Sequence, residues 1–263
     1  MTMTMTTHLQ RTVVWGGFRV WQRNWDAFKR AWKVEIGGYT VEPFIMLVTL
    51  GFGLGHYVEN IDGLSYAQFL APGVIASYAM FHATFDSTFG AYIRMETNNI
   101  YEAVLFTPME PADITLGEIM WSATRATIAG IAVLFAATLF GLIGSPFAIF
   151  AIPVAFMTGF MVASIGMNLT ATATTIGAMN NFFTLFILPM FYVSGIFFPT
   201  DQLPDLAQKV AWFLPLTPAA SLIRGLVTGD LSLMMIAWTA QMVLYSTVAY
   251  LTASRFLRRR LIK

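Results

Sequence analysis

The sequence predicts an all-α protein that crosses a membrane six times, and its composition and the grouping of its apolar residues carry this prediction. Of the 263 residues, 57% are hydrophobic and 11% are charged, whereas a soluble domain has about 25% charged residues. Too few polar side chains are present to cover a water-facing surface, so lipid must surround most of the chain. The apolar residues form windows of about 20 residues, the length that crosses a bilayer. The windows run over 40–58, 67–90, 119–143, 147–170, 178–198 and 231–253.

The distribution of Lys and Arg predicts the orientation of these spans. Six basic residues precede the first window and five follow the last, whereas the connection 59–66 has none. Because basic segments stay in the cytoplasm, an even number of spans places both termini there, in a multi-pass protein of the inner (cytoplasmic) membrane. The segment between the second and third windows is then cytoplasmic, and the connection 199–230 faces outside.

Residues 13–34 are expected to form an amphipathic helix in the membrane interface. Aromatic and charged residues recur there every three or four positions, on two different helical faces. Such a helix places its aromatic face at headgroup depth and its cations near anionic lipid. The alternative is a helix whose aromatic face is buried on protein. The aromatic positions are Phe18, Trp21, Trp25, Phe28 and Trp32, and the charged ones are Arg19, Arg23, Asp26, Arg30 and Lys33.

The cytoplasmic stretch YEAVLFTPMEPADITLGE, from Tyr101 to Glu118, is acidic and contains no basic residue. This composition is unusual on the side of the membrane where Lys and Arg normally prevail. We expect a short helix over 98–112 that Pro108 and Pro111 end, turning the chain back toward the third span. The stretch is either a solvated loop or a surface that docks on a partner.

The external connection is expected to hold two short helices. Pro204 can start a helix that ends near Leu214, and Thr217 can cap a second one with Pro218 at its first position. Gly229 can close this second helix. Each has only about ten residues, too few to span, so we expect both to dip into the outer leaflet and return.

Several kinds of chemistry are missing from the sequence. It contains no P-loop, no H-E-x-x-H and no G-x-S-x-G motif, and its three histidines are scattered. We therefore expect no catalytic residue, no metal site and no ATP site in this chain, so it is not predicted to be an enzyme. Small residues in the first and fourth windows instead predict close helix packing. They are Gly51, Gly53 and Gly55, and Gly159, Ala163, Gly166 and Thr170.

Two charged residues inside the windows are candidates for a role in the transport pathway or in gating. Asp86 lies in the second window, and Arg125 in the third, where a charge is costly to bury. The alternative is structural pairing, for example of Arg125 with Asp86 or Glu118, which would tie spans two and three together. The aromatic fifth window adds further pathway candidates, with contact to lipid as their alternative. These are Phe182, Phe186 and Tyr192.

Four stretches resemble the permease subunits of ABC type-2 exporters, and most closely the NodJ-like branch. They are SYAQFLAPGVIA (65–76), EAVLFTP with DITLGE (102–108 and 113–118), FFPTDQLP (197–204) and LPLTPAASLIRGLVTG (214–229). The resemblance covers essentially the whole chain and implies one transmembrane domain over 1–263. Arg224 lies in the external helix that carries the last stretch.

The resemblance also implies partners. A second copy of the chain would complete a homodimer, and two copies of a P-loop ATPase would bind ATP and Mg. Membrane lipid and an amphipathic cargo are expected to bind, and nucleic acid is not. The acidic stretch would then be a coupling helix docked on the ATPase, with apolar anchors and carboxylates facing basic groups. These residues are Glu102, Val104, Leu105, Phe106, Glu110 and Asp113.

The function that the sequence favours is outward, ATP-driven movement of an amphipathic cargo such as a lipo-oligosaccharide or another glycolipid. A drug or lipid efflux permease of the same architecture is one alternative. A membrane scaffold or sensor that transports nothing is another.

Overall fold

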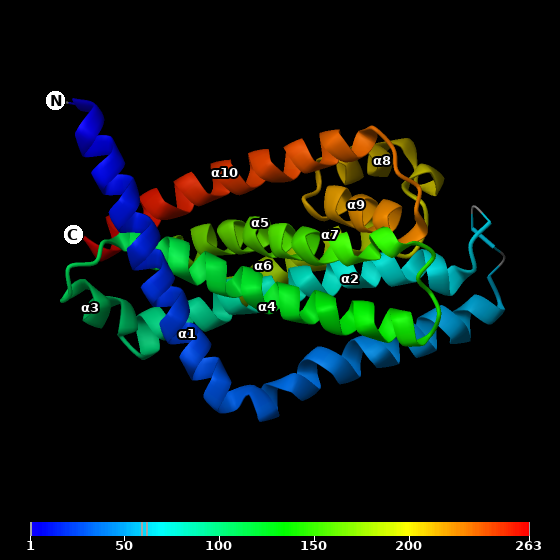
Figure 1. Ribbon diagram of the computed structural model, residues 1–263, viewed down its shortest axis with the longest axis horizontal. Coiled ribbons are helices and arrows are strands. Elements are labelled where there is room, and N and C mark those ends of the chain that lie inside the picture. The colour runs from blue at the N-terminus through cyan, green and yellow to red at the C-terminus, as the bar shows by residue number, and fades with distance from the viewer. Residues whose placement is uncertain (1, 59, 62, 263) are drawn as a thin grey trace.

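The computed structural model describes residues 2–58, 60–61 and 63–262, with side chains from Trp15 onward, and within them the chain is a bundle of helices without a β-strand (Figure 1). The all-α prediction is thereby confirmed. The α-helices are α1 (Thr2–Met46), α2 (Tyr66–Phe85), α3 (Ile100–Leu105), α4 (Pro111–Leu139), α5 (Ala151–Thr172), α6 (Gly177–Phe182), α7 (Leu188–Val193), α8 (Asp205–Phe213), α9 (Leu216–Thr228) and α10 (Met234–Leu261).

The first helix joins two parts that the sequence suggested separately. α1 continues through the helical turns Leu47–Gly53 and Leu54–His56, so the expected interfacial helix and the first window form one unbroken element. Figure 1 shows that this element bends near its middle. Its N-terminal half crosses one end of the bundle at a steep angle to the other helices, and its second half runs along them.

Four of the described helices are long and apolar enough to cross a membrane, which supports a membrane protein. They are Trp15–His56, Pro111–Leu139, Pro146–Thr172 and Met234–Leu261, and α8 with α9 would add a fifth if this pair, bent by 86°, were one span. The prediction of six spans needs α2 and the shorter apolar segment Gly177–Val193 as well. α2 is surrounded by protein, since most of its side chains are buried. The count of six therefore stays a prediction.

Small residues allow the central helices to approach closely, as the sequence suggested for the fourth window. A methyl group on Gly159 of α5 would overlap Ala126 of α4, and one on Gly166 would overlap Ser87. Gly51 and Gly55 face Ala67 and Tyr66 of the same chain. The absence of a side chain at both positions thus lets the turns after α1 approach α2 inside one molecule.

The external helices differ from expectation at one cap. α8 begins after Pro204 and ends before Leu214, as expected, and Gly229 ends α9 with a positive φ of 89°. However, α9 begins at Leu216, so Thr217 is not its N-cap. The hydroxyl of Thr217 instead donates to the carbonyl of Ala211 over 2.6 Å, an acceptor at the end of α8 that also receives the backbone N–H of Leu214 over 3.1 Å.

The last helix ties the bundle together from outside. Asn168 of α5 donates to the carbonyl of Ala249 over 2.8 Å. The guanidinium of Arg260 donates to the carbonyls of Thr170 and Ala173, where α5 ends, and pairs with Glu96 over 2.8 Å. A cation at a helix C-terminus satisfies free carbonyls and complements the helix dipole.

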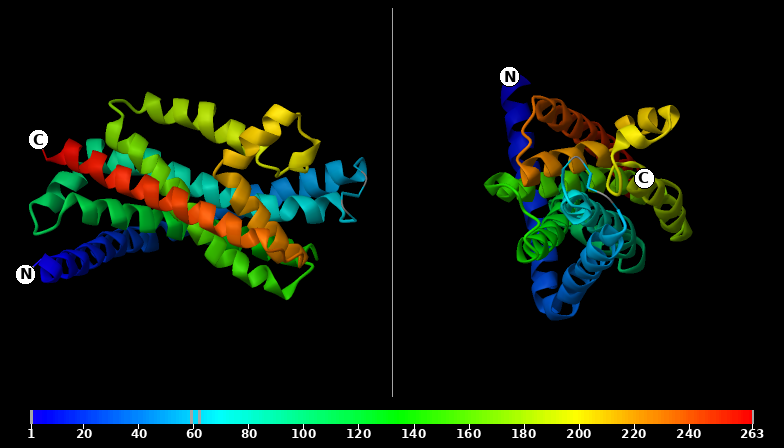
Figure 2. Two further views of the ribbon diagram at one scale, coloured as in Figure 1. Left: turned by 90° about the horizontal axis from the view of Figure 1, so that it is seen from above. Right: turned by 90° about the vertical axis from the view of Figure 1, so that its right-hand side faces the viewer.

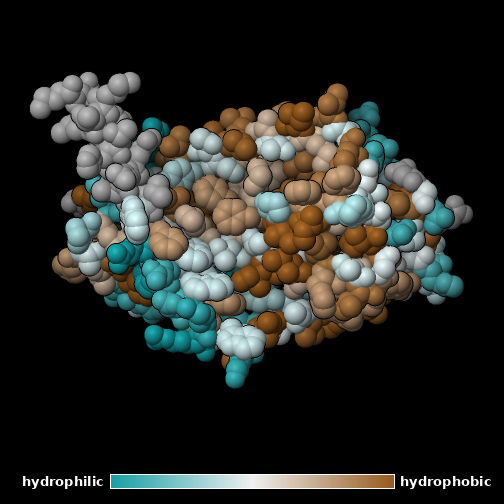
Figure 3. Space-filling model, in the orientation of Figure 1, coloured by the Kyte–Doolittle hydropathy of each residue, from teal (hydrophilic) through white to brown (hydrophobic). Residues whose placement is uncertain are grey.

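The surface has the polarity of a protein that lies in a bilayer. Figure 3 shows an apolar band over the middle of the visible face and a hydrophilic region where the N-terminal half of α1 crosses the bundle. Figures 1 and 2 place the start of α1, the end of α10 and α3 at one end, and the turn Leu54–His56 and α8 toward the other. This arrangement matches the expectation that both termini lie on the same side as the acidic stretch.

Single cysteines in this cysteine-free chain test that topology. Tyr57→Cys should react with a membrane-impermeant maleimide in intact cells, because Tyr57 is exposed at the end expected to face outside. Thr107→Cys, exposed beside α3, should react only after the membrane is opened. Lys209→Cys on α8 is the control and should behave like Tyr57→Cys. Equal labelling of positions 57 and 107 from one side would contradict the topology.

Candidate functional site

The acidic stretch forms a shorter helix than the sequence suggested. α3 covers only Ile100–Leu105, and it begins after Asn99, whose φ of 51° is left-handed. Pro111 is already the first residue of α4, and Glu110 is its N-cap. The expected helix over 98–112 is therefore one short helix, a turn around Pro108 and the start of α4. Pro108 keeps α3 from continuing, because proline is excluded from a helix interior. Pro111 suits the start of α4, because proline is favoured at the first position of a helix.

The structure separates the six expected coupling residues into two groups. Phe106 is 92% exposed, and Glu102 and Glu110 are also exposed. Val104 and Leu105 are half-buried and pack against the core. Asp113 is buried and accepts a hydrogen bond of 2.8 Å from the backbone N–H of Glu110. It caps α4, so only the exposed group is presented to a partner.

α3 is held on the bundle by Tyr101. This residue is fully buried, and burial together with the nearby carboxylate of Glu118 raises the pKa of its phenol well above the usual value. The phenol therefore stays protonated. α3 thus rests through one large side chain on the charged residues at this end of the bundle.

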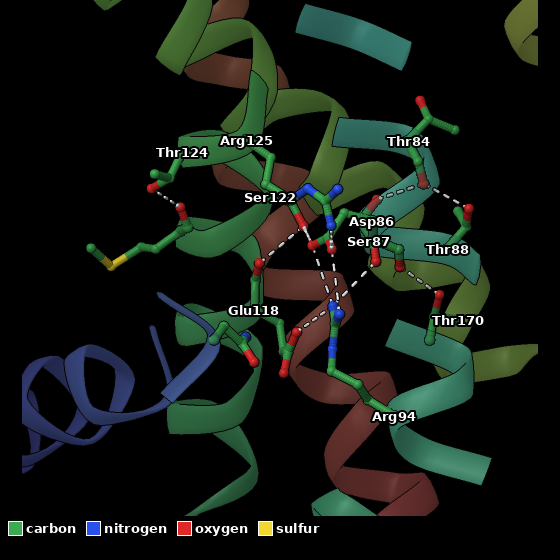
Figure 4. Close-up of polar contacts among 12 residues, drawn as sticks. Thr84, Asp86, Ser87, Thr88, Arg94, Glu118, Ser122, Thr124, Arg125 and Thr170 are labelled. Atoms are coloured by element: carbon green, nitrogen blue, oxygen red, sulfur yellow. Dashed lines mark hydrogen bonds and ion pairs between the residues drawn. The ribbon is translucent and has the colours of Figure 1, made fainter. Parts of the chain in front are cut away.

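Behind α3 lies a charged cluster that links three helical segments. Its members are Arg23 and Glu35 of α1, Asp86 and Arg94 of the helical turns that extend α2 (Asp86–Gly90 and Ile93–Thr97), and Glu118 and Arg125 of α4. We call these six residues the charge network. Figure 4 shows Asp86 between Arg94 and Arg125, with Glu118 on the other side of Arg94.

The contacts of the charge network form a continuous chain. Glu118 pairs with Arg23 over 2.8 Å and with Arg94 over 2.7 Å. Arg94 also pairs with Asp86 over 3.2 Å. Asp86 pairs in turn with Arg125 over 3.3 Å, and Arg125 reaches Glu35 over 2.6 Å.

The sequence suggested structural pairing of Arg125 with Asp86 or with Glu118. The pair with Asp86 is present, whereas Glu118 pairs with Arg23 and Arg94 instead.

The charge network is balanced, since it contains three guanidinium groups and three carboxylates, and Glu118 is fully buried within it. A buried carboxylate is tolerable only when charges and hydrogen bonds compensate it. The network therefore holds α1, the extension of α2 and α4 in one arrangement.

The N-terminal half of α1 reaches this network because its aromatic face packs on α4. The indole N–H of Trp21 donates to the hydroxyl of Thr124 over 2.9 Å. Trp25 and Phe28 contact the ring of Trp121 with centroids 6.2 and 5.6 Å apart. The alternative of an aromatic face buried on protein thus holds for the middle of this face, whereas Phe18 and Trp32 at its ends are exposed.

A large apolar cavity lies on the other side of the charge network. Its volume is about 840 Å³, and it opens between the second half of α1, α2 and the α6–α7 segment. Most of its wall is aliphatic or aromatic, including Phe81, Phe85 and Phe183. Its polar side chains are Glu42, Tyr66, Tyr78, His82 and Tyr192. A cavity of this size and composition is typical of a small-molecule site.

The aromatic candidates of the fifth window fall on different faces. Tyr192 lines the cavity. Phe182 and Phe186 stack on each other with ring centroids 5.2 Å apart and do not line it. Phe183 lines the cavity instead, and its ring contacts that of Phe85 with centroids 4.9 Å apart. The seven aromatic residues of this window follow no regular spacing, so the sequence alone could not identify Phe183 as the one that lines the cavity.

Arg224 of α9 joins the external helices to the bundle. Its guanidinium donates to the carbonyl of Gly195 over 2.7 Å and lies 4.1 Å from the ring centroid of Phe69 in α2. Both contacts hold the turn after α7 and the start of α2 near α9. The structure therefore gives this residue a packing role.

Sequence reasoning missed Glu35, Glu42 and His82. Glu35 belongs to the charge network, and the other two line the cavity. A signal for Glu42 was present, since it is the single carboxylate in the first window, residues 40–58. His82 was considered only as a metal ligand, and no cluster suited to a metal ion occurs among the described residues.

Comparison with known proteins agrees with this architecture. A model of the ABC-2 type transporter family matches residues 18–228. The chain belongs to the ABC-2 type transporter family. Nodulation protein J of Rhizobium leguminosarum bv. viciae is 39% identical over 244 residues, 93% of this chain and 94% of that protein. Nodulation protein J of Rhizobium meliloti is 35% identical over 247 residues, 94% of each chain.

Membership in the ABC-2 transporter family makes the chain a membrane transport component rather than an enzyme. The matched range includes the charge network, α3, the cavity wall and α9. The resemblance found in the sequence is confirmed at this level.

Gly117 of α4 lies where α1 crosses it and provides a test of the charge network. A methyl group there would overlap Val20 and the carbonyl of Gly17. Gly117→Leu should therefore displace the first half of α1 and separate Arg23 from Glu118. We expect a stability loss of about 1–3 kcal/mol from overpacking, measured by thermal unfolding in lipid nanodiscs.

The matched control is Gly37→Leu in α1. No atom lies within 4 Å of a methyl group placed there, so stability should not fall and should rise by up to about 1 kcal/mol, because leucine favours a helix more than glycine does. If Gly117→Leu melted at the same temperature as Gly37→Leu, the close packing of α1 on α4 at Gly117 would not hold α1 in place.

Proposed function

We propose that this chain is the permease subunit of an ATP-driven exporter that moves an amphipathic cargo outward. The observation that carries the proposal is the large, mostly apolar cavity with a few polar side chains, which lies between helices of a membrane transport component. Its volume of about 840 Å³ suits a ligand with an apolar part of many carbon atoms. Polar side chains on one part of its wall suit a ligand with a polar head.

The energy for export is proposed to come from a separate ATPase. The sequence contains no P-loop, so ATP and Mg are expected on that partner. α3 and the turn after it offer a docking surface at the end where the chain begins and ends (Figure 1). Phe106, 92% exposed, would be its apolar anchor, since aromatic side chains often dominate an interface.

The carboxylates beside Phe106 support a basic partner surface. Glu102 and Glu110 are exposed and would face cationic groups of the ATPase. Charges at the rim of an interface mainly set the rate and the register of association. This also gives a reason for acidic residues on the side of the membrane where basic ones prevail.

Two copies of the chain and two ATPase chains are proposed to form the working complex, in the inner membrane with both termini in the cytoplasm. Gly51 and Gly55 face residues of their own chain, so we expect the contact between copies to lie elsewhere. Leu185 of the fifth segment is 76% exposed and offers an apolar face for that contact. Native mass spectrometry in lipid would count the copies.

A lipo-oligosaccharide or another glycolipid is the cargo class proposed from the sequence. Extrusion of a drug or a lipid is the alternative, because the same apolar wall would accept both. The test is ATP hydrolysis by the complex in lipid vesicles, with candidate cargo added. Stimulation by glycolipids supports the proposal, stimulation only by apolar drugs favours efflux, and no stimulation by any cargo favours a scaffold or sensor.

Phe106 is the residue that tests coupling. Phe106→Ala should weaken binding of the ATPase by about 30-fold, because truncating a central aromatic anchor costs about 2 kcal/mol or more. Leu105 is a poor choice, since it also packs against the core of the chain itself. Binding would be measured by titrating the ATPase onto the permease in nanodiscs.

Phe135→Ala is the matched control, since Phe135 is 64% exposed on α4, far along the chain from α3. It should bind the ATPase like the parent. The Glu102→Gln, Glu110→Gln double variant should associate more slowly and with less salt dependence. If Phe106→Ala binds and supports ATP turnover like Phe135→Ala, α3 is not the docking helix.

A further inference from the structure

Three of the five polar side chains of the cavity lie at one place in its wall. Glu42 lies one helical turn after Tyr39, and His82 lies one turn after Tyr78, so each pair shares a helical face. The rings of Tyr39 and His82 stack with centroids 4.2 Å apart, and Glu42 and Tyr78 line the same cavity. The facing turns of α1 and α2 thus bring Glu42, Tyr78 and His82 together. We call these three residues the polar corner.

Glu42 is exposed on the cavity wall, and no described cationic side chain pairs with its carboxylate. The charge network next to the cavity is neutral in itself, with three arginines and three carboxylates. Glu42 takes part in no ion pair with any residue whose side chain the structure describes. A carboxylate in an apolar segment is costly unless it meets a partner. Its position in the wall of a cavity points to a partner that enters from outside the chain.

The rest of the wall is mostly apolar, with Tyr66 and Tyr192 as its polar side chains. Phe81 contacts Phe183 and Phe191 with centroids 5.9 and 5.0 Å apart, and Phe191 contacts Phe197 over 4.9 Å. These rings cover the side formed by α2 and the α6–α7 segment. They suit a hydrocarbon chain, which would gain about 0.8 kcal/mol for each buried methylene.

We propose that the cavity binds an amphiphile whose apolar chain lies on the phenylalanine wall and whose head donates hydrogen bonds to the carboxylate of Glu42. The head carries hydroxyl or ammonium groups, and Tyr78 and His82 supply further hydrogen bonds. A head with a negative charge is excluded, because it would meet the charge of Glu42 in a medium of low dielectric constant. The inference rests on the proposed function, since it names the head chemistry of the cargo.

Glu42 would then select the head group of the amphiphile that binds in the cavity. Glu42→Gln keeps the size and one acceptor but removes the charge. A hydrogen bond to a charged acceptor is stronger than one to a neutral amide, so the variant should lose affinity for donor heads. It should also lose its repulsion toward anionic heads.

Photolabelling of the full chain in lipid vesicles tests this directly and needs no ATPase. Three probes share a dodecyl chain with a terminal diazirine and differ only in the head: glucoside, ammonium or phosphate. The glucoside or the ammonium probe should label peptides of α2 and of 177–198, about tenfold more than the phosphate probe. If only one of the two donor probes does so, that probe identifies the donor as hydroxyl or as amine.

Glu42→Gln should reduce this preference to about threefold or less, by lowering the labelling with the donor probes and raising it with the phosphate probe. Asp201→Asn, an acid-to-amide change in the exposed turn Thr200–Gln202, is the control and should keep the parent's preference. The parent protein decides the question even if Glu42→Gln folds poorly.

Equal labelling of these peptides by all three probes would overturn the inference, as would an unchanged preference in folded Glu42→Gln. The proposed function fails separately. If cargo stimulates ATP hydrolysis by the complex while the probes show no preference for donor heads, the exporter stands and the role of Glu42 does not.

Discussion

Two buried carboxylates, Asp86 and Glu118, constrain how the rest of the bundle can pack. Each is almost completely removed from solvent, and a carboxylate in such a place costs several kcal/mol unless cations and hydrogen bonds surround it. The cations come from three different segments: Arg23 from α1, Arg94 from the extension of α2 and Arg125 from α4. Ser122 adds a hydrogen bond of 2.7 Å to Asp86. Movement of α1 or of the extension of α2 would remove one of the two guanidinium groups that pair with Glu118, and movement of α4 would remove both.

The charge network also lies between the two surfaces that matter for transport. On one side, Tyr101 seats α3 against it, and burial and Glu118 raise the pKa of that phenol. On the other side, Arg125 donates to the hydroxyl of Tyr39 over 2.6 Å, and Tyr39 stacks on His82 in the cavity wall. A continuous set of contacts therefore joins the proposed docking helix to the proposed cargo site. Such a set of contacts is a physical route by which binding of the ATPase at α3 could affect the cavity.

The sequence was sufficient for what depends on neighbours along the chain. Apolar windows predicted the all-α membrane fold, Pro204 marked the start of α8 and Gly229 the end of α9, and the small residues of α5 indicated close packing. Contacts between distant segments could not be predicted from the sequence. Nothing local pairs Arg23 with Glu118, 95 residues away, or selects Phe183 over Phe182 for the cavity. The amphipathic pattern of α1 was correct, but periodicity alone could not decide between lipid and α4 as its neighbour.

The most direct test of the account is a double-mutant cycle on Arg94 and Glu118, with stability measured by reversible unfolding in lipid or detergent. Arg94→Met and Glu118→Gln should each destabilise the chain, since each removes one of the two ion pairs of a buried charged group. The account predicts that the double variant loses less than the sum of the two, by about 1–3 kcal/mol. The exposed pair Lys29–Asp26, 2.7 Å apart, should give a coupling of about 1 kcal/mol or less. Additive losses at Arg94 and Glu118 would show that the carboxylates do not depend on this network, and would contradict the account.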